Sequence, residues 1–205
     1  MDNYIISNVA ELREVIGDEI PELGEKNIDH LDEFSTAFIK ECPFIVLSTS
    51  DKNGRVDASP KGDAPGFVHI VDDKTIVIPD RPGNKLAYGH LNIIENPRVG
   101  LLMTIPGTNE TLRINGKAEL SREPELLESL AARGKAAVIA IKIHIEECFF
   151  HCGKATIRSK LWNSNEWPAK HKVSFGEMYA KKKNLGDDVS KRIDESIHVD
   201  YRDNL

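Results

Sequence analysis

The sequence predicts a mainly β protein with flanking helices, in which about six antiparallel strands joined by short turns form a small closed or split barrel. Two patterns predict this class. Between residues 44 and 146, apolar and polar side chains alternate along short runs, and turn-forming residues separate these runs. Helical spacing of apolar residues is limited to short segments around them. The 205 residues contain no internal repeat and correspond to one domain with appendages.

Residues 1–42 are predicted to form an acidic helical arm. Asn8 and Glu11 have capping-box spacing, and the helix that they begin is expected to end before Pro21. Its apolar positions recur at intervals of three and four: Val9, Leu12, Ile16 and Ile20. A second helix is predicted from about Asp29. Its apolar face consists of Leu31, Phe34 and Phe38. The sequence leaves open whether these helices pack against the barrel or cover a cleft in it.

Three hairpins and one long strand are predicted to follow. The hairpins pair residues 44–50 with 55–61, residues 67–71 with 75–79, and residues 98–105 with 111–121. The last strand, 137–146, has isoleucines at every second position from Ile139 to Ile145. Two further helices are predicted over residues 84–95 and 124–133.

The predicted domain boundaries are residues 1–42 for the arm, 43–165 for the barrel and 166–205 for a peripheral tail. The apolar density falls after Trp167, and three consecutive lysines occur at 181–183.

Charge excludes some partners. The net charge is −6, from 27 Lys and Arg against 33 Asp and Glu, and residues 1–33 hold ten acidic but only two basic side chains. The remainder is close to neutral, whereas a nucleic-acid binder needs a basic footprint, so no nucleic-acid partner is predicted.

The longest apolar run has six residues, so no membrane partner is expected. Three cysteines and no visible secretory signal predict a cytoplasmic location.

The segment 79–85 is the first candidate site. It joins a predicted strand to a predicted helix start, where unpaired backbone N–H groups and the helix dipole favour anions. Arg81 and Lys85 add two positive charges, and Gly83 lets the backbone approach a ligand closely. A phosphate site is one interpretation of this pattern. The other is a Pro-Gly turn with solvated charges.

A second candidate site lies on the predicted strand 55–61. Asp57, Ser59 and Lys61 share one face of that strand, where they could bind a ring ligand with a carbonyl-rich edge. The alternative is an ordinary exposed strand face. Arg113 lies on the polar face of another strand, and it too could be either a ligand contact or a solvated charge.

Four potential metal ligands cluster within nine residues: His144, Cys148, His151 and Cys152. On a continuous strand His151 would point away from the other three, and no second cluster completes a tetrahedral site. No metal site is therefore predicted. Cys152 is a candidate reactive thiol, because His151 adjoins it and Lys154 is near.

Five motifs in order give the chain a family resemblance. They are Phe44-Ile-Val-Leu-Ser-Thr-Ser50, Asp57-Ala-Ser-Pro-Lys-Gly-Asp63, Ile78-Pro-Asp-Arg-Pro-Gly-Asn-Lys85, Ile94-Glu-Asn-Pro-Arg-Val-Gly-Leu101 and Thr111-Leu-Arg-Ile-Asn-Gly-Lys-Ala118. The set resembles the pyridoxamine 5'-phosphate oxidase-like flavoproteins, over roughly residues 30–165. The resemblance implies a six-stranded antiparallel split β-barrel that binds FMN, with residues 43–165 as the FMN-binding domain.

The resemblance also implies roles for individual residues. The loop that begins at Asp80 matches the family's phosphate cradle, so that Arg81, Asn84 and Lys85 become phosphate or ribityl ligands. Ser59, Pro60 and Lys61 match the strand along the isoalloxazine ring, and Arg113 matches a polar face near the same flavin. In a homodimer with FMN at the subunit interface, the second subunit would contribute Lys154, Arg158 and Trp162.

The expected function is an FMN-dependent oxidoreductase with a small-molecule substrate and NAD(P)H as candidate electron donor. Lys61 is expected to stabilise the negative charge that develops on flavin reduction. Residues 196–205 lack the basic segment of authentic pyridoxamine-phosphate oxidases, so vitamin B6 oxidation is not expected. The sequence leaves open a non-catalytic flavin-binding or redox-sensing module, an F420-dependent reductase, a haem binder and a cofactor-free dimeric scaffold.

Overall fold

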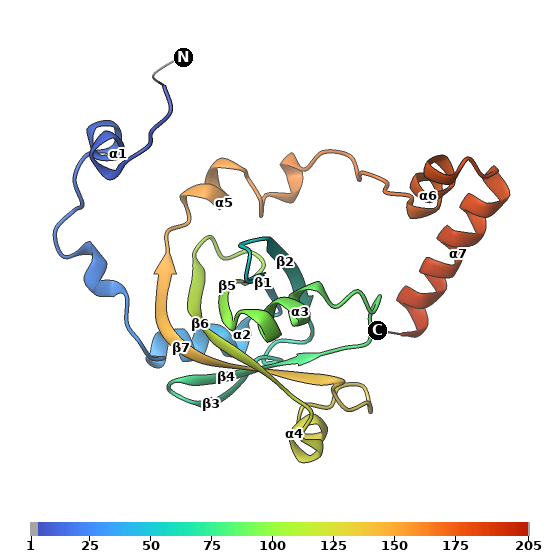
Figure 1. Ribbon diagram of the computed structural model, residues 1–205, viewed down its shortest axis with the longest axis horizontal. Coiled ribbons are helices and arrows are strands. Elements are labelled where there is room, and N and C mark those ends of the chain that lie inside the picture. Colours follow the sequence, from blue (N-terminus) through green and yellow to red (C-terminus); the bar gives the residue numbers. More distant parts are fainter. Residues whose placement is uncertain (1–3, 205) are drawn as a thin grey trace.

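A single antiparallel sheet of seven strands forms the centre of the computed structural model, which describes residues 4–204 (Figure 1). The first three residues of the predicted arm and the last residue of the predicted tail lie outside the described residues. The strands are β1 (Phe44–Ser50), β2 (Val56–Gly62), β3 (His69–Asp72), β4 (Thr75–Asp80), β5 (Arg98–Thr104), β6 (Thr111–Ser121) and β7 (Ile139–His151). Their order in the sheet is β2-β1-β5-β6-β7-β4-β3.

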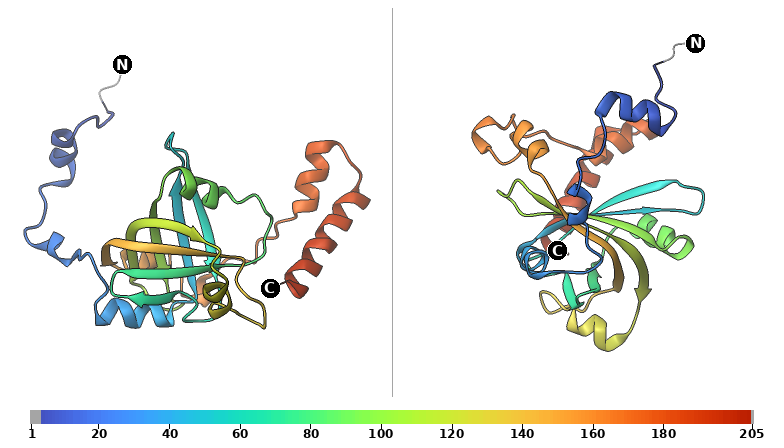
Figure 2. Two further views of the ribbon diagram at one scale, coloured as in Figure 1. Left: turned by 60° about the horizontal axis from the view of Figure 1, so that its bottom comes forward. Right: turned by 90° about the vertical axis from the view of Figure 1, so that its left-hand side faces the viewer.

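The three predicted hairpins are confirmed as β1–β2, β3–β4 and β5–β6. The mainly β class with flanking helices is confirmed, but the sheet contains seven strands and not the predicted six, and its strand order is open. Its edges are β2 and β3, and no ladder within residues 4–204 joins them. The edge strand β3 has four residues and pairs only with β4. The sheet is strongly curved (Figure 2), and buried side chains fill the space that it encloses.

The core lies on the concave side of the sheet. The alternation predicted for the last strand is confirmed, since Ile141, Ile143 and Ile145 are buried while Lys142 and His144 are exposed. The strand itself is longer than predicted and continues to His151, because β6 pairs with it from Ser121 to Thr111. Side chains from β1, β4, β5 and β6 complete this core, among them Ile45, Leu47, Ile76, Ile78, Met103, Leu112 and Ile114.

Two helices flank the concave side. The helix α2 (Glu33–Glu41) begins with a capping box formed by Asp32 and Ser35, and it buries Ser35 and Ile39. The predicted apolar face is therefore partly wrong, since Phe34 is 65% exposed. The helix α3 (Tyr88–Glu95) lies against β1, β2 and β6.

The helix predicted over residues 84–95 begins four residues later than expected. Lys85 and Ala87 have positive φ angles of 61° and 55°, a left-handed conformation that cannot continue an α-helix. The Asn84 side chain also accepts a hydrogen bond from the Leu86 backbone N–H at 3.0 Å, and such local bonds compete with helix formation. Residues 81–87 are consequently a loop, and the helix N-terminus is not at Asn84.

The helix predicted over 124–133 is also shorter, as α4 (Pro124–Ser129). Arg133 and Gly134 have φ angles of 51° and 74°, so the chain turns there and Ala132 pairs with Lys135. The remaining helical segments are α5 (Lys154–Arg158), α6 (Phe175–Lys183), α7 (Asp187–Asp203) and the 3-10 turns Leu23–Lys26 and Ser164–Glu166.

The terminal segments stand away from the sheet. The helix α1 (Val9–Ile16) is capped by Asn8, whose side chain accepts from the Glu11 N–H as predicted, and it ends earlier than predicted, at Gly17. None of its residues is buried. At the other end of the molecule, α6 and α7 form a helical hairpin that is joined to the body by an extended segment (Figures 1 and 2).

One ion-pair network ties three segments together beneath the loop at residues 81–87. The buried Asp63, just after β2, accepts from Arg81 Nε at 3.1 Å and from Arg133 Nη2 at 3.1 Å. Arg81 Nη1 also donates to the Leu130 carbonyl at 2.9 Å. Burial raises the pKa of Asp63, but the Ala64 N–H and the two guanidinium groups lower it by more, to below its ordinary value of 3.8.

Replacing this carboxylate removes a pH-dependent contribution to stability. A carboxyl whose pKa is lowered by folding stabilises the protein above its unfolded-state pKa, and this contribution is lost as the pH falls through the folded pKa. We expect Asp63→Asn to lower the free energy of unfolding by about 1–3 kcal/mol at pH 7. The difference from wild type should shrink below about pH 4. Denaturant unfolding from pH 7 to 3 tests this, with exposed Glu125→Gln as control. A difference that does not change with pH would contradict it.

A second stability prediction concerns the irregularity of the β6–β7 ladder at Gly116. A Cβ built at Gly116 would lie 2.1 Å from the His144 carbonyl oxygen. We expect Gly116→Ala to lower the free energy of unfolding by about 1–3 kcal/mol, because the backbone of β7 must move. Gly24→Ala is the control, since no heavy atom lies within 4 Å of its Cβ position. Thermal unfolding of both variants measures the contrast, and equal melting temperatures would refute the steric explanation.

Candidate functional site

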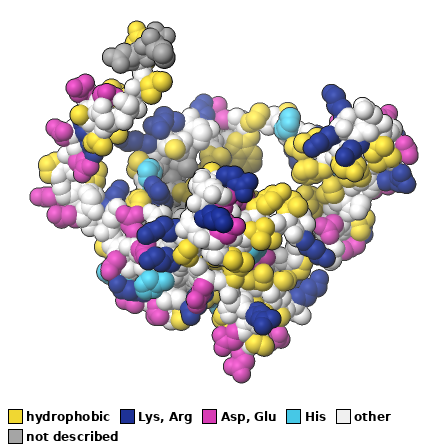
Figure 3. Space-filling view, in the orientation of Figure 1, with side chains coloured by type: hydrophobic (Ala, Val, Ile, Leu, Met, Phe, Trp, Pro, Cys, Tyr) yellow, Lys and Arg dark blue, Asp and Glu magenta, His cyan; other side chains and the backbone are white. Residues whose placement is uncertain are grey.

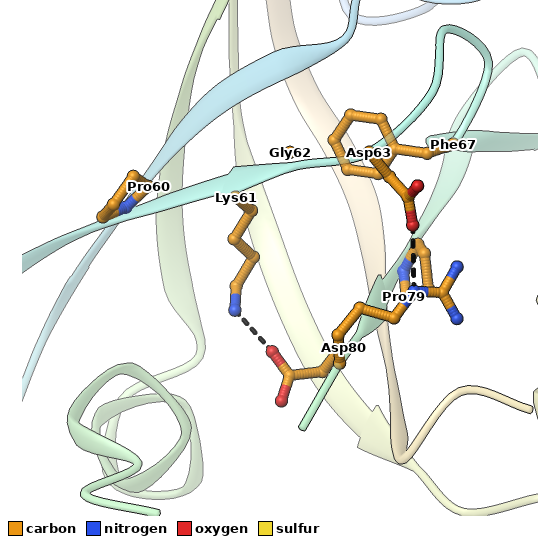
Figure 4. Close-up of a pocket in the computed structure, with 8 residues that line it drawn as sticks. Pro60, Lys61, Gly62, Asp63, Phe67, Pro79 and Asp80 are labelled. Carbon is orange, nitrogen blue, oxygen red and sulfur yellow. Dashed lines mark hydrogen bonds and ion pairs between the residues drawn. The ribbon is translucent and has the colours of Figure 1, made fainter. Parts of the chain in front are cut away.

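A cavity of about 190 Å³ opens where β2 and β4 end, beside the loop at residues 81–87. Its walls are Pro60, Lys61, Gly62, Asp63, Phe67, Pro79, Asp80 and Arg81. Figure 4 shows Lys61 extending from β2 toward Asp80, with the aromatic ring of Phe67 above Asp63. The structure thus brings four of the predicted site residues, Pro60, Lys61, Asp80 and Arg81, to one place.

An ion pair joins the two strands at this cavity. Lys61 Nζ donates to Asp80 Oδ1 at 2.5 Å, and both side chains are largely buried, with 15% and 17% of their surface exposed. Burial raises the pKa of Asp80, but the neighbouring His90 and Lys61 lower it by more, so that its carboxyl is more acidic than usual. The lysine charge is therefore held in place by a carboxylate.

His90 is the third member of this cluster. It projects from α3, and its Nε2 lies 3.4 Å from Asp80 Oδ2. That nitrogen is buried and makes no well-oriented hydrogen bond to any described residue. Buried polar atoms are normally hydrogen-bonded, so this ring nitrogen is available to a polar group or a water molecule that enters the site.

Ser59 lies on the same strand face as Lys61 but is directed to α3. Its hydroxyl donates to Asp57 Oδ2 at 2.6 Å. A Cβ at Gly89 of α3 would lie 3.6 Å from the Ser59 hydroxyl and 3.5 Å from Asp57 Oδ2, so the helix backbone covers this face closely. Asn92 of α3 donates to Thr49 at 3.0 Å and holds the helix there.

In the loop at residues 81–87, Arg81 is held by two protein groups, whereas Lys85 is exposed. Arg81 uses Nε and Nη1 to bind Asp63 and the Leu130 carbonyl, which leaves Nη2 for a ligand. Asn84 and Lys85 are exposed, and the Asn84 side-chain oxygen is already bonded within the loop. The predicted phosphate site therefore consists of one anchored guanidinium and one exposed ammonium, without the helix start expected at Asn84.

Arg113 lies on the opposite, convex face of the sheet, and Pro60 has the same strand parity although it also lines the edge of the cavity. Pro60 is registered with Val46, Val46 with Leu102, and Leu102 with Arg113 across four neighbouring strands. The Arg113 guanidinium lies 5.0 Å from the ring centroid of Phe149, a cation–π distance. The register therefore places Arg113 away from the cavity that Pro60 and Lys61 line.

Lys154, Arg158 and Trp162 lie elsewhere, at the turn between β5 and β6. Trp162 Nε1 donates to the Thr108 carbonyl at 2.8 Å, while Lys154 and Arg158 are exposed on α5. They line neither the cavity nor its rim within one chain.

Two residues of the site, Asp63 and His90, were not singled out in the sequence. Asp63 ends one of the five motifs, and its partner Arg81 was already a candidate. The acidic residue two positions after Lys61 was therefore the signal in the sequence that could have identified it. His90 carries no spacing signal, because only folding brings α3 against the end of β4.

Among residues 4–204, no three or more His, Cys, Asp and Glu side chains gather where they could hold a metal ion. His144 and Cys148 lie on β7, the first exposed and the second buried, and Cys152 is an exposed free thiol after it. In the same described range, no helix is both long and apolar enough to cross a membrane.

Comparisons with solved structures find similar chains of low identity. HupZ from Group A Streptococcus is 20% identical, with 58% of this chain and 93% of that chain covered and a TM-score of 0.48. A protein from Lactobacillus delbrueckii, described as a candidate pyridoxamine 5'-phosphate oxidase, is 21% identical, with 60% and 95% covered and a TM-score of 0.46. An FMN-binding protein from Syntrophomonas wolfei is 13% identical, with 56% and 79% covered and a TM-score of 0.42.

A search of curated proteins finds no match. A family model gives the decisive comparison. The model described as pyridoxamine 5'-phosphate oxidase matches residues 31–152, from two residues before α2 to the residue after β7. This match takes in the whole seven-stranded sheet and the cavity. Because it spans more than half of the sequence, the chain belongs to the pyridoxamine 5'-phosphate oxidase family.

Proposed function

We propose that the protein binds FMN and acts as an FMN-dependent oxidoreductase on a small molecule. Family membership supports a flavin, and one observation in particular supports its phosphate: Lys61 and Arg81 line one cavity, and the exposed loop that begins at Arg81 adds Lys85, in a body whose net charge is close to neutral. A phosphate with two negative charges is stabilised by such a local concentration of donors. The buried ring nitrogen of His90, 3.4 Å from Asp80, adds a further polar group behind this ion pair.

The residues present fit this cofactor. Lys85 and the free Nη2 of Arg81 would hold the phosphate, and Asn84 would offer its amide group to the ribityl chain. Lys61 would approach the ring, at its N1–C2 edge, from the wall of the cavity. The bound flavin would supply the hydride and electron chemistry. Asp80 keeps the Lys61 side chain extended across the cavity, because the two side chains are hydrogen-bonded.

A homodimer would complete both the site and the predicted split barrel. The convex face carries apolar side chains in contact with solvent, including the diagonal neighbours Phe44 at 42% and Leu102 at 40% exposed on β1 and β5. Neighbouring exposed apolar residues mark a protein interface. Pairing of two such faces would place Arg113 at the interface and bring the partner's α5 toward the flavin, with the positions Lys154, Arg158 and Trp162. The three domains predicted from the sequence and the cytoplasmic location belong to the same proposal.

Loss of the phosphate ligands should abolish flavin binding. We expect the purified protein to show visible bands of bound oxidised FMN, and the Arg81→Ala/Lys85→Ala variant to bind FMN at least a hundredfold more weakly, because two charge-assisted contacts are lost. Arg133→Ala is the matched control. It removes the other guanidinium from Asp63 but no predicted flavin ligand.

Absorption spectra after addition of FMN and desalting give the readout. Wild-type protein that retains no FMN would refute the proposal, and F420 is then the next ligand to add. Equal losses in the double variant and in Arg133→Ala would assign the effect to the Asp63 network instead. With FMN bound, oxidation of NAD(P)H with an electron acceptor tests for an enzyme, and its absence would indicate a flavin-binding module.

Lys61 and Asp80 should change the flavin reduction potential in opposite directions. A positive charge near the ring stabilises the reduced flavin, so we expect Lys61→Ala to lower the midpoint potential by about 30 mV, or about 1.4 kcal/mol for a two-electron couple. Asp80→Asn removes a negative charge beside Lys61 and should raise the potential. Redox titration of the bound flavin measures both. Unchanged potentials in both variants would place this ion pair away from the ring.

A further inference from the structure

The two ends of the chain carry helices with unpartnered apolar faces. On α1, Val9 is 71%, Val15 70% and Ile16 62% exposed. On α6, Phe175 is 50%, Met178 63% and Tyr179 49% exposed. Apolar side chains lie together along the C-terminal hairpin in Figure 3. Surface apolar residues grouped on a helix face mark a contact surface, whereas isolated ones do not.

The charges of these two ends are opposite. Residues 4–26 contain six acidic and two basic side chains, whereas residues 169–183 contain five basic and one acidic. Lys182 follows Met178 by four residues and therefore adds a positive charge to the same face of α6. Each end thus presents an apolar stripe beside charges of the sign that the other would attract.

The C-terminal hairpin is a preformed unit and not a loose tail. Asp194 of α7 accepts from the Ser174 hydroxyl at 2.5 Å and from the Gly176 N–H at 2.8 Å, which caps α6. A Cβ at Gly176 would lie 2.0 Å from the Ser190 carbonyl oxygen, so the two helices are in backbone contact. A rigid surface of this kind loses little entropy on docking.

The two complementary surfaces lie at opposite ends of the longest axis of the chain (Figure 1). A two-fold axis that places two copies side by side in opposite directions brings each copy's α1 to the other copy's hairpin, and it makes the contact twice. We propose that the N-terminal helix of one copy docks on α6 of a second copy, so that the two ends clasp the dimer. This inference rests on the homodimer of the proposed function, and not on the flavin.

Charge reversal tests the docking. We expect Lys181→Glu/Lys182→Glu to raise the dimer dissociation constant at least tenfold at low salt, with a smaller effect in 0.5 M NaCl because salt screens exposed charges. Combining it with Glu14→Lys/Asp18→Lys in the same chain should restore the dimer. Lys52→Glu/Lys135→Glu is the control, an equal change of charge at exposed positions outside both helices. Analytical ultracentrifugation measures the constants. An unchanged dissociation constant, or no restoration, would overturn the proposal.

Cross-linking identifies which chains meet. Val15→Cys and Met178→Cys are made separately in a Cys152→Ser background, so that the remaining cysteines, Cys42 and Cys148, are buried. After mixing and oxidation, we expect a disulfide-linked species of two chains that contains one of each variant. Its absence from the mixture, together with a link inside one chain when both cysteines are combined, would refute docking between copies.

The flavin content of the same samples separates the two proposals. A colourless dimer that cross-links would refute FMN binding and support the clasp. A dimer that retains FMN but does not cross-link would refute the clasp and support FMN binding. A protein that stays monomeric at every concentration would overturn the clasp together with the proposed homodimer.

Discussion

The pairing of β7 with two different partners is the constraint on which the other features depend. β7 is hydrogen-bonded to β6 from Ala140 to His151 and to β4 from Ile139 to His144, so one strand joins the two halves of the sheet. Without it, the β3–β4 hairpin would have no neighbour in the sheet. The end of β4 carries Asp80 and Arg81, and the cavity therefore exists only because β7 holds that end in place.

Most of the strands could be predicted because their signal is local. Alternating isoleucines in β7 and turn residues between β1 and β2 depend only on neighbours in the sequence. The start of α3 at Tyr88 and the end of α4 at Ser129 could not be predicted in this way. They depend on left-handed conformations at Lys85, Ala87 and Arg133, residue types that do not ordinarily favour that region. The surrounding fold imposes these conformations, and no pattern of hydrophobicity reports them.

The site divides along the same line. The ordered motifs predicted the family and drew attention to Lys61 and Arg81, because short motifs keep their residue types. The partners of these residues come from elsewhere in the chain: Asp80 is 19 residues from Lys61, and Asp63 is 18 residues from Arg81. Such pairs form only after the strands are placed, so the sequence could show Lys61, Asp80 and Arg81 but not which carboxylate holds which cation. The ligand roles of the eleven predicted residues stay predictions.

The position of Pro60 has a consequence for how copies of this chain associate. β2 is an edge of the sheet, and such edges can extend one sheet into the next molecule through unpaired backbone groups. Proline lacks a backbone N–H, so β2 offers an incoming strand an interrupted set of donors. Growth of the sheet into ribbons is thereby discouraged at this edge, even though the neighbouring Val56 and Ala58 are exposed. Apolar surface can thus remain open for a finite assembly without turning the protein into a template for fibres.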